Sequence, residues 1–459
     1  MNYDLIVIGG GPAGYVGAIR AAQLGKKVAC IENDRAGGTC LNWGCIPTKA
    51  LLKNAELYHT IAHRADEFGL KIEGLSYDWS KVIGRSRKVS DKLCGGIEFL
   101  FKKNKVDYIR GTGRIPAAGK VEVTDKDGKK ETHEAKNILI ATGAKARPMP
   151  SFPFNGKTVI GSREALILEK QPKEIIIVGA GAIGIEFAYF FNAYGTKVTV
   201  VEMLPRVLPV EDDDVSAALE KSLKKQGIRL LTNTKVTATK DHGDKVSLTV
   251  EGAANETLEA EICLVAIGVM PVLPEGVELK LTERGWLNTD ANYQTNVQGI
   301  YGAGDIIGPP WLAHVASYEA IQCVHGLFKP GFKPKKVTNF PGCTYCQPQV
   351  ASIGLTERDV KAKGLKYKVG QFPYAASGKA LAVAEPEGFV KIIYGEPHGE
   401  ILGAHIIGSE ATEMIAELGL AITLEATMDE IEATIHAHPT LSEMVHEATS
   451  VAEGHPIHI

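Results

Sequence analysis

The sequence predicts an α/β fold with two Rossmann-type dinucleotide-binding domains and a separate C-terminal α+β domain. Two observations predict the dinucleotide-binding domains: one glycine pattern occurs twice, and each copy follows an apolar strand and precedes a helical stretch. A third observation predicts the last domain. Apolar stretches at "VASIGL", "GFVKIIY" and "ILGAHII" precede a helical periodicity that begins at Glu410.

The length and charge of the chain limit its function classes. At 459 residues the chain is too long for one ordinary core, which predicts two to four domains. The net charge of −3 gives no electrostatic reason to expect nucleic acid or an anionic membrane as a partner. Glycines and Glu186 interrupt the most apolar run, 175–191, so no membrane span is expected. The N-terminus enters an apolar strand without a basic leader, which predicts no export signal and a cytoplasmic location.

The repeated block covers 4–32 and 174–202, and matching residues are 170 positions apart. In each block the first glycine makes a tight turn, the second lets the backbone approach a pyrophosphate, and the third lets helix and strand pack closely. The pyrophosphate is expected at the helix N-terminus. The matching residues are Gly9, Gly11, Gly14, Gly25 and Glu32 in the first block and Gly179, Gly181, Gly184, Gly195 and Glu202 in the second.

An acidic residue closes each block at the end of its second strand. Glu32 and Glu202 are expected to accept hydrogen bonds from adenosine ribose hydroxyls. A carboxylate at Glu202 would also repel a 2′-phosphate, so the second site is predicted to take NAD rather than NADP. Arg206, close in sequence, is the one feature that favours NADP.

Three later strand ends carry glycines that would line the same sites. "NILIATGA" ends at Thr142–Ala144, and "CLVAIGV" contains Gly268. The third, "GIYGAGDIIG", places Asp305 in a glycine-rich turn, where we expect it exposed at the tip and able to bind sugar-alcohol hydroxyls.

The stretch "GGTCLNWGCIPTKALL" at 37–52 holds two cysteines, Cys40 and Cys45, directly before a predicted helix. The pair could be a metal clip, a structural staple or a redox pair. A metal needs more ligands than two, and no second Cys or His cluster adjoins the pair in sequence. Pro47 suits the first helical turn, which would put Cys45 just before a helix N-terminus, where a thiolate is stabilised. Lys49 adds a cation one turn later. The pattern therefore favours electron relay between two dinucleotide cofactors through a dithiol.

That stretch resembles the redox-active disulfide motif of the flavoprotein disulfide reductases, and the resemblance covers the whole chain. "CIPTKALL", "GSEATEMI" at 408–415 and "HAHPTLSE" at 436–443 are most similar to the dihydrolipoamide dehydrogenase branch. Glutathione reductases typically have basic residues where this chain has Glu202. Mercuric reductases typically carry a C-terminal cysteine pair, whereas this chain has no cysteine after Cys346.

The resemblance implies FAD at the first block, NAD at the second, and a role for each matching residue. Cys40 would be the interchange thiol that meets the substrate, and Cys45 the thiol against the flavin. Lys49 would lie near the flavin N5 and pair with Glu186. His438 would be the acid-base residue, oriented by Glu443; a histidine titrates near neutrality and suits proton transfer at a thiol. The remaining implied contacts are Gly113, Thr142, Gly143, Asp305, Ala313 and His314 with the flavin nucleotide and Val236 and Gly268 with NAD.

Three features depart from the family pattern. Trp43 lies between the two cysteines, where it could crowd the disulfide or cover it. Ala182 occupies a position that often carries a bulkier residue gating the nicotinamide pocket. Cys343 and Cys346 form a second close pair in "PGCTYCQPQ", and structural or incidental, secondary redox and metal-binding interpretations stay open.

The resemblance also implies a domain order and an activity. We expect an FAD domain at 1–143, an NAD domain at 144–268, a central segment at 269–338 that completes the FAD domain, and a C-terminal dimerisation domain at 339–459. The chain is expected to form a homodimer, to hold no metal, and to oxidise protein-bound dihydrolipoamide with NAD+. Its partners would be lipoyl domains of 2-oxoacid dehydrogenase or glycine cleavage complexes. The alternatives are an NADH-dependent reductase of another small disulfide or acceptor, and a non-catalytic flavin-binding subunit.

Overall fold

The N-terminal part of the chain forms a mostly parallel sheet in which β1 is central. In the computed structural model, which describes residues 2–149 and 153–459, the strand order is β3-β2-β1-β6-β5-β4. β1 pairs in parallel with β2 and β6, and β17 pairs with the other edge of β6 although it lies far along the chain. The strands are β1 (Asn2–Ile8), β2 (Val28–Glu32), β3 (Asp107–Arg110), β4 (Thr112–Ala117), β5 (Lys120–Thr124), β6 (Lys130–Ile140) and β17 (Ile300–Gly302).

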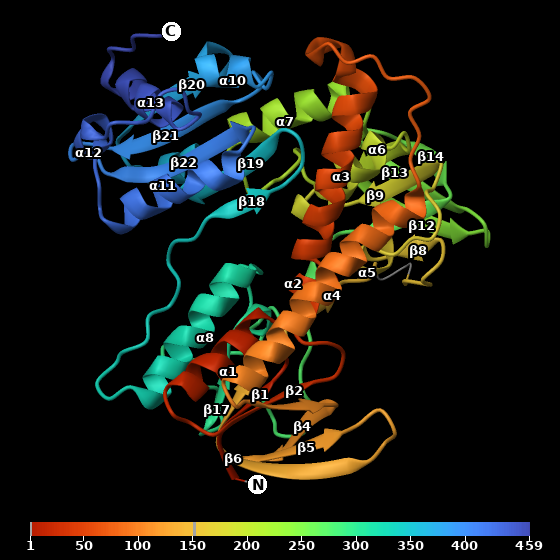
Figure 1. Cartoon of the computed structure of the whole chain (residues 1–459), viewed down its shortest axis with the longest axis vertical. Coiled ribbons are helices and arrows are strands. Elements are labelled where there is room, and N and C mark those ends of the chain that lie inside the picture. Colours follow the sequence, from red (N-terminus) through yellow and green to blue (C-terminus); the bar gives the residue numbers. More distant parts are fainter. Residues whose placement is uncertain (1, 150–152) are drawn as a thin grey trace.

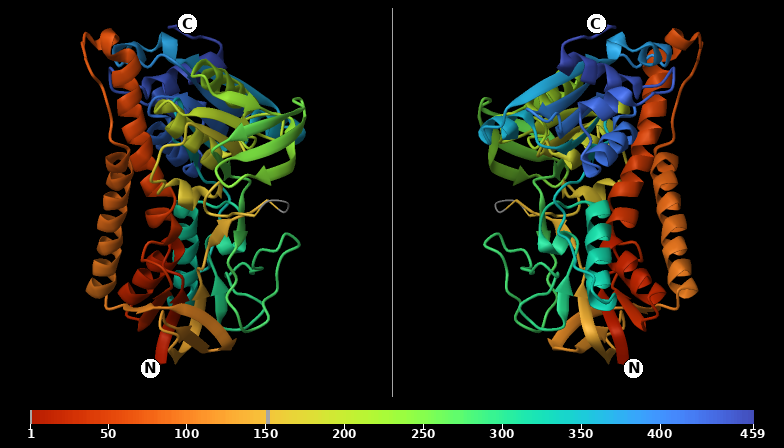
Figure 2. Two further views of the ribbon diagram at one scale, coloured as in Figure 1. Left: turned by 90° about the vertical axis from the view of Figure 1, so that its right-hand side faces the viewer. Right: turned by 90° about the vertical axis from the view of Figure 1, so that its left-hand side faces the viewer.

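Helices cover this sheet and carry the cysteine motif. α1 and α8 lie side by side against it, and their small residues, among them Gly17 and Ala320, allow the close approach (Figure 1). α3 and α4 are long and run next to each other along one side of the molecule (Figure 2). The helices of this part are α1 (Pro12–Gln23), α2 (Gly38–Asn42), α3 (Cys45–Arg64), η1 (Ala65–Phe68), α4 (Trp79–Lys103), η2 (Asp305–Ile307) and α8 (Ala313–Phe328).

The middle part repeats the design with a second parallel sheet of order β11-β10-β9-β15-β8 and a separate three-stranded meander. A two-stranded ribbon, β7 with β16, joins this part to the first. The strands are β7 (Ala144–Ala146), β8 (Val159–Ile160), β9 (Glu174–Val178), β10 (Lys197–Val201), β11 (Arg229–Leu231), β12 (Thr234–Asp241), β13 (Val246–Gly252), β14 (Glu256–Ala260), β15 (Ile262–Val265) and β16 (Val269–Pro271). The helices are α5 (Ser162–Ala165), α6 (Ala182–Ala193) and α7 (Asp213–Lys225).

The C-terminal part is an antiparallel sheet of order β18-β19-β22-β21-β20 with α11 and α13 packed on it. Every residue of β21 is buried, and its sequence is apolar except for Lys391 and the final Gly395. The strands are β18 (Gly342–Thr344), β19 (Gln349–Gly354), β20 (Tyr367–Pro373), β21 (Phe389–Gly395) and β22 (Ile401–Gly408). The helices are α9 (Glu357–Ala362), η3 (Tyr374–Ala376), α10 (Gly378–Ala382), α11 (Ala411–Thr423), α12 (Met428–Ala433) and α13 (Glu443–Glu453).

This architecture confirms the predicted fold class: two Rossmann-type units and a C-terminal α+β domain. The pairing of β17 with β6 agrees with a central segment that returns to the first sheet, while the domain boundaries at 143, 268 and 338 stay a prediction. One local expectation is corrected: Cys45 is the first residue of α3 and does not precede the helix, while Pro47 lies in the first turn as predicted. Within the described residues, no helix has the length and apolar character needed to cross a membrane.

Candidate active site

One large cavity of about 1750 Å³ joins the two glycine motifs, the cysteine motif and β18. It extends from the first Rossmann unit to the second, as a site for two successive cofactors requires. The predicted site residues that line it are Gly9, Gly11, Glu32, Cys40, Cys45, Lys49, Gly113, Thr142, Gly143, Gly179, Gly181, Glu186, Glu202, Val236, Gly268, Asp305 and Ala313.

The two glycine turns have nearly the same geometry. Gly9 and Gly179 adopt positive φ angles of 105° and 107°, which side chains disfavour. Gly11 and Gly181 are the N-caps of α1 and α6, so the unpaired N–H groups of both helices face the cavity. A Cβ at Gly181 would meet nothing within 4 Å, which leaves open space where a pyrophosphate would lie. These residues therefore fit two dinucleotides, one at each helix N-terminus.

Gly14 and Gly184 do not line the cavity. A Cβ at Gly14 would lie 1.8 Å from the carbonyl oxygen of Gly9, and one at Gly184 would lie 2.0 Å from that of Gly179. Both glycines therefore allow the close strand–helix packing that the motif predicts.

The acidic residues at the strand ends also brace their own turns, a function that sequence reasoning missed. Glu32 accepts hydrogen bonds from the backbone N–H groups of Gly10 and Asp34, both at 2.7 Å. Glu202 does the same at the second turn, from Ala180 at 2.7 Å and Leu204 at 2.8 Å. Each carboxylate oxygen can accept a second hydrogen bond. The predicted ribose contacts are thus compatible with this bracing and stay predictions.

Arg206 is already engaged by an acidic residue. Its guanidinium pairs with Asp213, which also pairs with Arg358. Arg206 is not among the residues that line the cavity. An arginine held in this way does not offset Glu202, which supports the predicted preference for NAD.

The two thiols of the cysteine motif lie within hydrogen-bonding contact of each other. Cys40 lies on α2 and Cys45 is the first residue of α3, and both are free thiols, the reduced form of the pair. The hydrogen bond with Cys40 lowers the pKa of Cys45; burial opposes this effect and the Lys49 cation adds to it. The same hydrogen bond, with burial, raises the pKa of Cys40. Cys45 is therefore the more stable thiolate, and the better leaving group, of the two.

Lys49 and Glu186 form the ion pair that the family resemblance implied. Nζ of Lys49 lies 2.9 Å from both carboxylate oxygens of Glu186, so the pair joins α3 of the first Rossmann unit to α6 of the second. Glu186 is only 4% exposed, and a buried carboxylate needs such a partner. The pair fixes an ammonium group one helical turn from Cys45.

Asp305 corrects an expectation. It is half-buried in the wall of the cavity and not exposed at the tip of its turn. Burial raises the pKa of its carboxyl group to about 6. A hydroxyl group of a bound nucleotide could donate a hydrogen bond there, as predicted, and would favour the ionised form.

His314 is exposed and lies outside the cavity wall. Its Nε2 lies 3.0 Å from the carbonyl oxygen of Pro341, at the connection to β18. Burial of part of the ring lowers its pKa. The predicted place beside a flavin stays a prediction.

His438 and Glu443 form a dyad on the C-terminal domain. Nδ1 of His438 lies 2.9 Å from one oxygen of Glu443, whose other oxygen accepts the N–H of Thr440 at 2.8 Å. Burial raises the pKa of Glu443, but these hydrogen bonds outweigh it and hold the pKa below its usual range. The side chain of His438 is 79% exposed. Among the described residues, the cavity wall extends no further along the chain than Cys343, so the dyad lies outside it.

Trp43 lines the cavity and contacts an acidic and two basic side chains. Its indole N–H donates to Asp34 at 2.8 Å, and Asp34 also pairs with Arg163 from α5 at 2.9 Å. The guanidinium groups of Arg163 and Arg87 lie 4.0 Å and 4.9 Å from the ring centroid. Trp43 therefore ties the motif to the second Rossmann unit. Ala182, the other departure, lines the cavity.

The Cys343–Cys346 pair is divided between two environments. Cys343 lines the cavity, whereas the Cys346 thiol is fully buried and donates to the carbonyl oxygen of Pro348 at 3.2 Å. Burial raises the pKa of both thiols, to about 11 for Cys343. Neither thiol is therefore prepared as a nucleophile.

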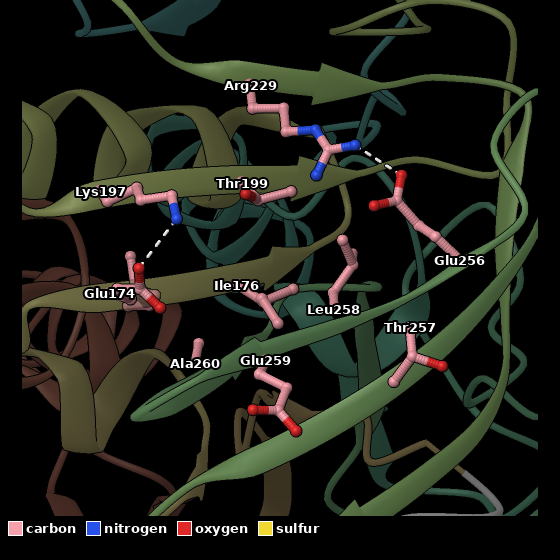
Figure 3. Close-up of a pocket in the computed structure, with 11 residues that line it drawn as sticks. Glu174, Ile176, Lys197, Thr199, Arg229, Glu256, Thr257, Leu258, Glu259 and Ala260 are labelled. Carbon is pink, nitrogen blue, oxygen red and sulfur yellow. Dashed lines mark hydrogen bonds and ion pairs between the residues drawn. The ribbon is translucent and has the colours of Figure 1, made fainter.

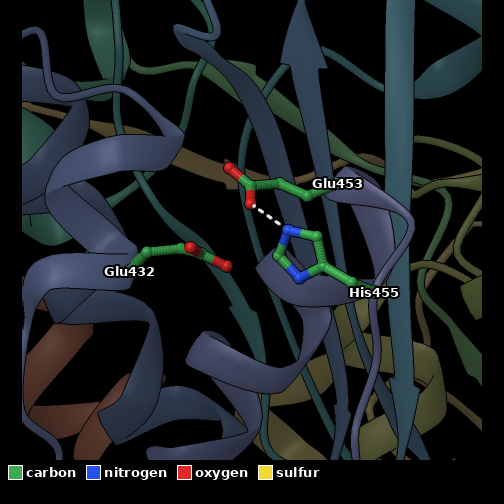
Figure 4. A group of neighbouring side chains, drawn as sticks. All are labelled: Glu432, Glu453 and His455. Carbon is green, nitrogen blue, oxygen red and sulfur yellow. Dashed lines mark ion pairs between the residues drawn. The ribbon is translucent and has the colours of Figure 1, made fainter.

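Two further groups of polar residues are satisfied locally. A smaller cavity of about 150 Å³ beside β14 is lined by the ion pairs Lys197–Glu174 and Arg229–Glu256 (Figure 3). Glu453 and His455, two positions apart in the chain, pair at 2.8 Å near Glu432 (Figure 4). The ion pairs satisfy most of these charges, and neither group lines the large cavity of the candidate active site.

Comparison with known proteins agrees with this geometry. A family model described as pyridine nucleotide-disulphide oxidoreductase matches residues 3–320, and the dimerisation domain of the same class matches residues 340–449. The chain belongs to the pyridine nucleotide-disulphide oxidoreductase family. This membership confirms the resemblance found in the sequence.

Relatives within this family match over nearly their whole length. The chain is 44% identical to a dihydrolipoyl dehydrogenase of Rhizobium etli, covering 99% of this chain and 98% of the relative. It is 44% identical to that of Bacillus subtilis, covering 100% and 99%. Among solved structures, LpdA from Mycobacterium tuberculosis is 28% identical with a TM-score of 0.90, covering 97% and 99%. The copper(II) complex of the flavoprotein disulfide reductase RclA from Escherichia coli is 26% identical with a TM-score of 0.88, covering 98% and 99%.

Proposed function

We propose that this protein is a dihydrolipoyl dehydrogenase that oxidises protein-bound dihydrolipoamide with NAD+ through FAD and the Cys40–Cys45 pair. The unequal environment of the two thiols is the observation that supports this reaction most directly: the hydrogen bond between them lowers the pKa of Cys45 and raises the pKa of Cys40. The full-length relatives named dihydrolipoyl dehydrogenase support the substrate class.

The two cofactors fit the cavity at its two helix N-termini. Gly9, Gly11 and Glu32 would hold FAD, and Gly179, Gly181 and Glu202 would hold NAD. When bound, FAD would supply the two-electron chemistry that links the thiol pair to hydride transfer to NAD+. The contribution of the chain is to align both nucleotides with the thiols, with Lys49 and Glu186 at the boundary of the two sites.

The thiol chemistry follows from the surroundings of each sulfur. In the oxidised pair, one substrate thiolate attacks Cys40, the Cys40–Cys45 bond breaks, and Cys45 leaves as a thiolate that Lys49 stabilises. The second substrate thiolate then attacks the mixed disulfide and releases Cys40. The substrate leaves as a disulfide, and its two electrons remain on the thiol pair. The substrate thiols lose their protons to a base, for which His438 is the candidate.

His438 is proposed to act in the site of a second subunit. The dyad is exposed and lies outside the cavity of its own chain, on the domain that matches the dimerisation model. Figure 1 draws α12, which precedes the dyad, and α13, which begins with Glu443, at the outer edge of the molecule. A homodimer would bring this edge to a neighbouring cavity, where Glu443 would orient the imidazole ring. Lipoyl domains of 2-oxoacid dehydrogenase or glycine cleavage complexes would then deliver the substrate.

Three steady-state assays on one preparation test this function. We expect turnover with dihydrolipoamide and NAD+ to exceed that with oxidised glutathione and NADPH or with Hg(II) and NADPH by orders of magnitude. A preparation with bound FAD that reduces glutathione or mercury faster than it oxidises dihydrolipoamide would contradict the proposal.

A further inference from the structure

The segment that contains the second cysteine pair brings the C-terminal domain against the Lys49–Glu186 pair. Just after β18, Tyr345 donates its backbone N–H to an oxygen of Glu186 at 3.0 Å. The aromatic ring of Tyr345 lies beside the ammonium group of Lys49, with Nζ 4.4 Å from the ring centroid. The ion pair is therefore held by three parts of the chain: α3, α6 and the strand exit at Tyr345.

These contacts fix both members of the ion pair. One oxygen of Glu186 accepts from Lys49 and from Tyr345, and the other accepts from Lys49 again. The backbone N–H of Tyr345 thus holds the carboxylate of Glu186. Substitution of the side chain at position 345 leaves this hydrogen bond in place. A lysine side chain is flexible, and the ring of Tyr345 restricts where its ammonium group lies through a cation–π contact.

The position of this ammonium group bears on the thiol pair. Lys49 lowers the pKa of Cys45, and Glu186 opposes it. The other ionisable groups that act on the two thiols are Tyr15 on α1 and Asp305 in the cavity wall, and Cys40 contacts Cys45 directly. A shift of Nζ away from Cys45 would weaken a favourable interaction with the thiolate and leave the opposing groups in place.

We propose that Tyr345 is a positioning residue whose ring holds the Lys49 ammonium group where it stabilises the Cys45 thiolate. The proposal rests on the proposed function, which assigns Cys45 as the thiolate of the redox pair. It also gives the segment "CTYC" a function: its tyrosine positions Lys49, and its cysteines stabilise the local turn. The Tyr345 hydroxyl donates a hydrogen bond to the sulfur of Cys343, and the Cys346 thiol donates to the carbonyl oxygen of Pro348.

The titration of Cys45 tests this inference without any turnover. In a Cys40→Ser background, which leaves one thiol of the pair, the rate of Cys45 alkylation by iodoacetamide is measured against pH and located by mass spectrometry. The absorbance band that a thiolate gives beside FAD is titrated in parallel. We expect Tyr345→Leu to raise the apparent pKa of Cys45 by about 0.5 to 1, the range that loss of a cation–π contact allows. Tyr345→Phe, which keeps the ring, should titrate like its parent.

A double-mutant cycle identifies the route of the effect. In a Lys49→Met background, Tyr345→Leu should no longer change the titration, because the ring acts through the ammonium group. Tyr345→Met, also without a ring, serves the same comparison if Tyr345→Leu does not fold. A folded ringless variant that titrates like its parent, or a shift that persists in the Lys49→Met background, overturns the inference. If Cys45 shows no lowered pKa even with Tyr345 present, the proposed thiol roles fail instead.

Discussion

The two thiols of the active-site motif differ in their surroundings: the hydrogen bond between them and the Lys49 cation lower the pKa of Cys45, and the same hydrogen bond raises the pKa of Cys40. Cys45 follows the N-cap Gly44 and has Lys49 one turn ahead, whereas Cys40 lies on a separate short helix. The cation favours the ionised form of a nearby thiol, and so does a helix N-terminus. At the scale of single residues, these surroundings favour a thiolate at Cys45 over one at Cys40.

Replacing each thiol in turn should separate their roles. Cys40→Ser should show a long-wavelength absorbance band with bound FAD without any reductant, because Cys45 remains as a thiolate against the flavin. Cys45→Ser should show no such band. Equal bands in the two variants, recorded on samples with equal FAD content, would contradict the assignment of Cys45.

Coenzyme choice should depend on the charge of Glu202. The wild-type protein is expected to have a much higher kcat/KM with NAD+ than with NADP+, because the carboxylate repels a 2′-phosphate. Glu202→Gln should narrow this ratio by weakening the use of NAD+ and relieving the repulsion of NADP+. Because Glu202 also accepts two backbone N–H groups, an amide that keeps one acceptor oxygen is the matched replacement. A wild-type preference for NADP+ would refute the prediction.

At the scale of secondary-structure elements, the features best predicted from the sequence are those that depend only on neighbouring residues. The two strand–turn–helix units are built from adjacent residues, and their glycines are required by positive φ angles and close packing, so the motif reveals them. Contacts between distant elements leave no such pattern. The bond from Tyr345 to Glu186 spans 159 residues, and the pairing of β17 with β6 crosses the whole second unit. The burial of Asp305 depends on the elements that pack around its turn, and the sequence does not show which elements these are.

The strand exit at 343–346 should tolerate loss of its thiols. In the variant with both Cys343→Ser and Cys346→Ser, the hydroxyl groups can still bond to Tyr345 and to the carbonyl oxygen of Pro348. We expect lipoamide turnover within a few-fold of wild type. A loss of turnover as large as that of Cys40→Ser would indicate that Cys343 and Cys346 form a second redox-active pair. That result would contradict a purely structural function.

At the scale of the whole molecule, a buried ion network joins the second Rossmann unit to the C-terminal domain. Lys391 on β21 is 1% exposed and contacts Asp212, Asp214 and Glu357 at 2.6 to 2.8 Å. Asp212 is also 1% exposed, so removal of the ammonium group would leave it buried without its cation. Sequence alone did not reveal this network, because its members lie far apart in the chain.

Lys391→Met should destabilise the protein by about 3–5 kcal/mol, the usual cost of breaking a buried ion pair on one side. Urea denaturation monitored by circular dichroism would measure it, with exposed Lys366→Met as the control. A loss below about 1 kcal/mol would contradict the stabilising role of this network.

The same network predicts how stability depends on acidity. Hydrogen bonds from Lys361 and Lys391 lower the pKa of Glu357 from 4.5 to about 2. Because the pKa is lower in the folded state, this contribution is complete above pH 4.5 and disappears as the pH falls toward 2. Glu357→Gln should therefore remove part of the acid sensitivity of the unfolding midpoint. An unchanged pH profile between 4.5 and 2 would contradict the prediction.

The shared active site is the central claim, and mixed dimers test it most directly. Cys40→Ser and His438→Gln homodimers should both be inactive, because each site then has one defect. A mixed dimer of the two, isolated with two affinity tags, would contain one site with both defects and one with neither. We predict activity toward half of wild type per dimer. The control is a dimer of wild type with the Cys40→Ser/His438→Gln double variant, prepared in the same way. If the mixed dimer is inactive while this control dimer is active, His438 does not act on the thiols of its partner, and the account is contradicted.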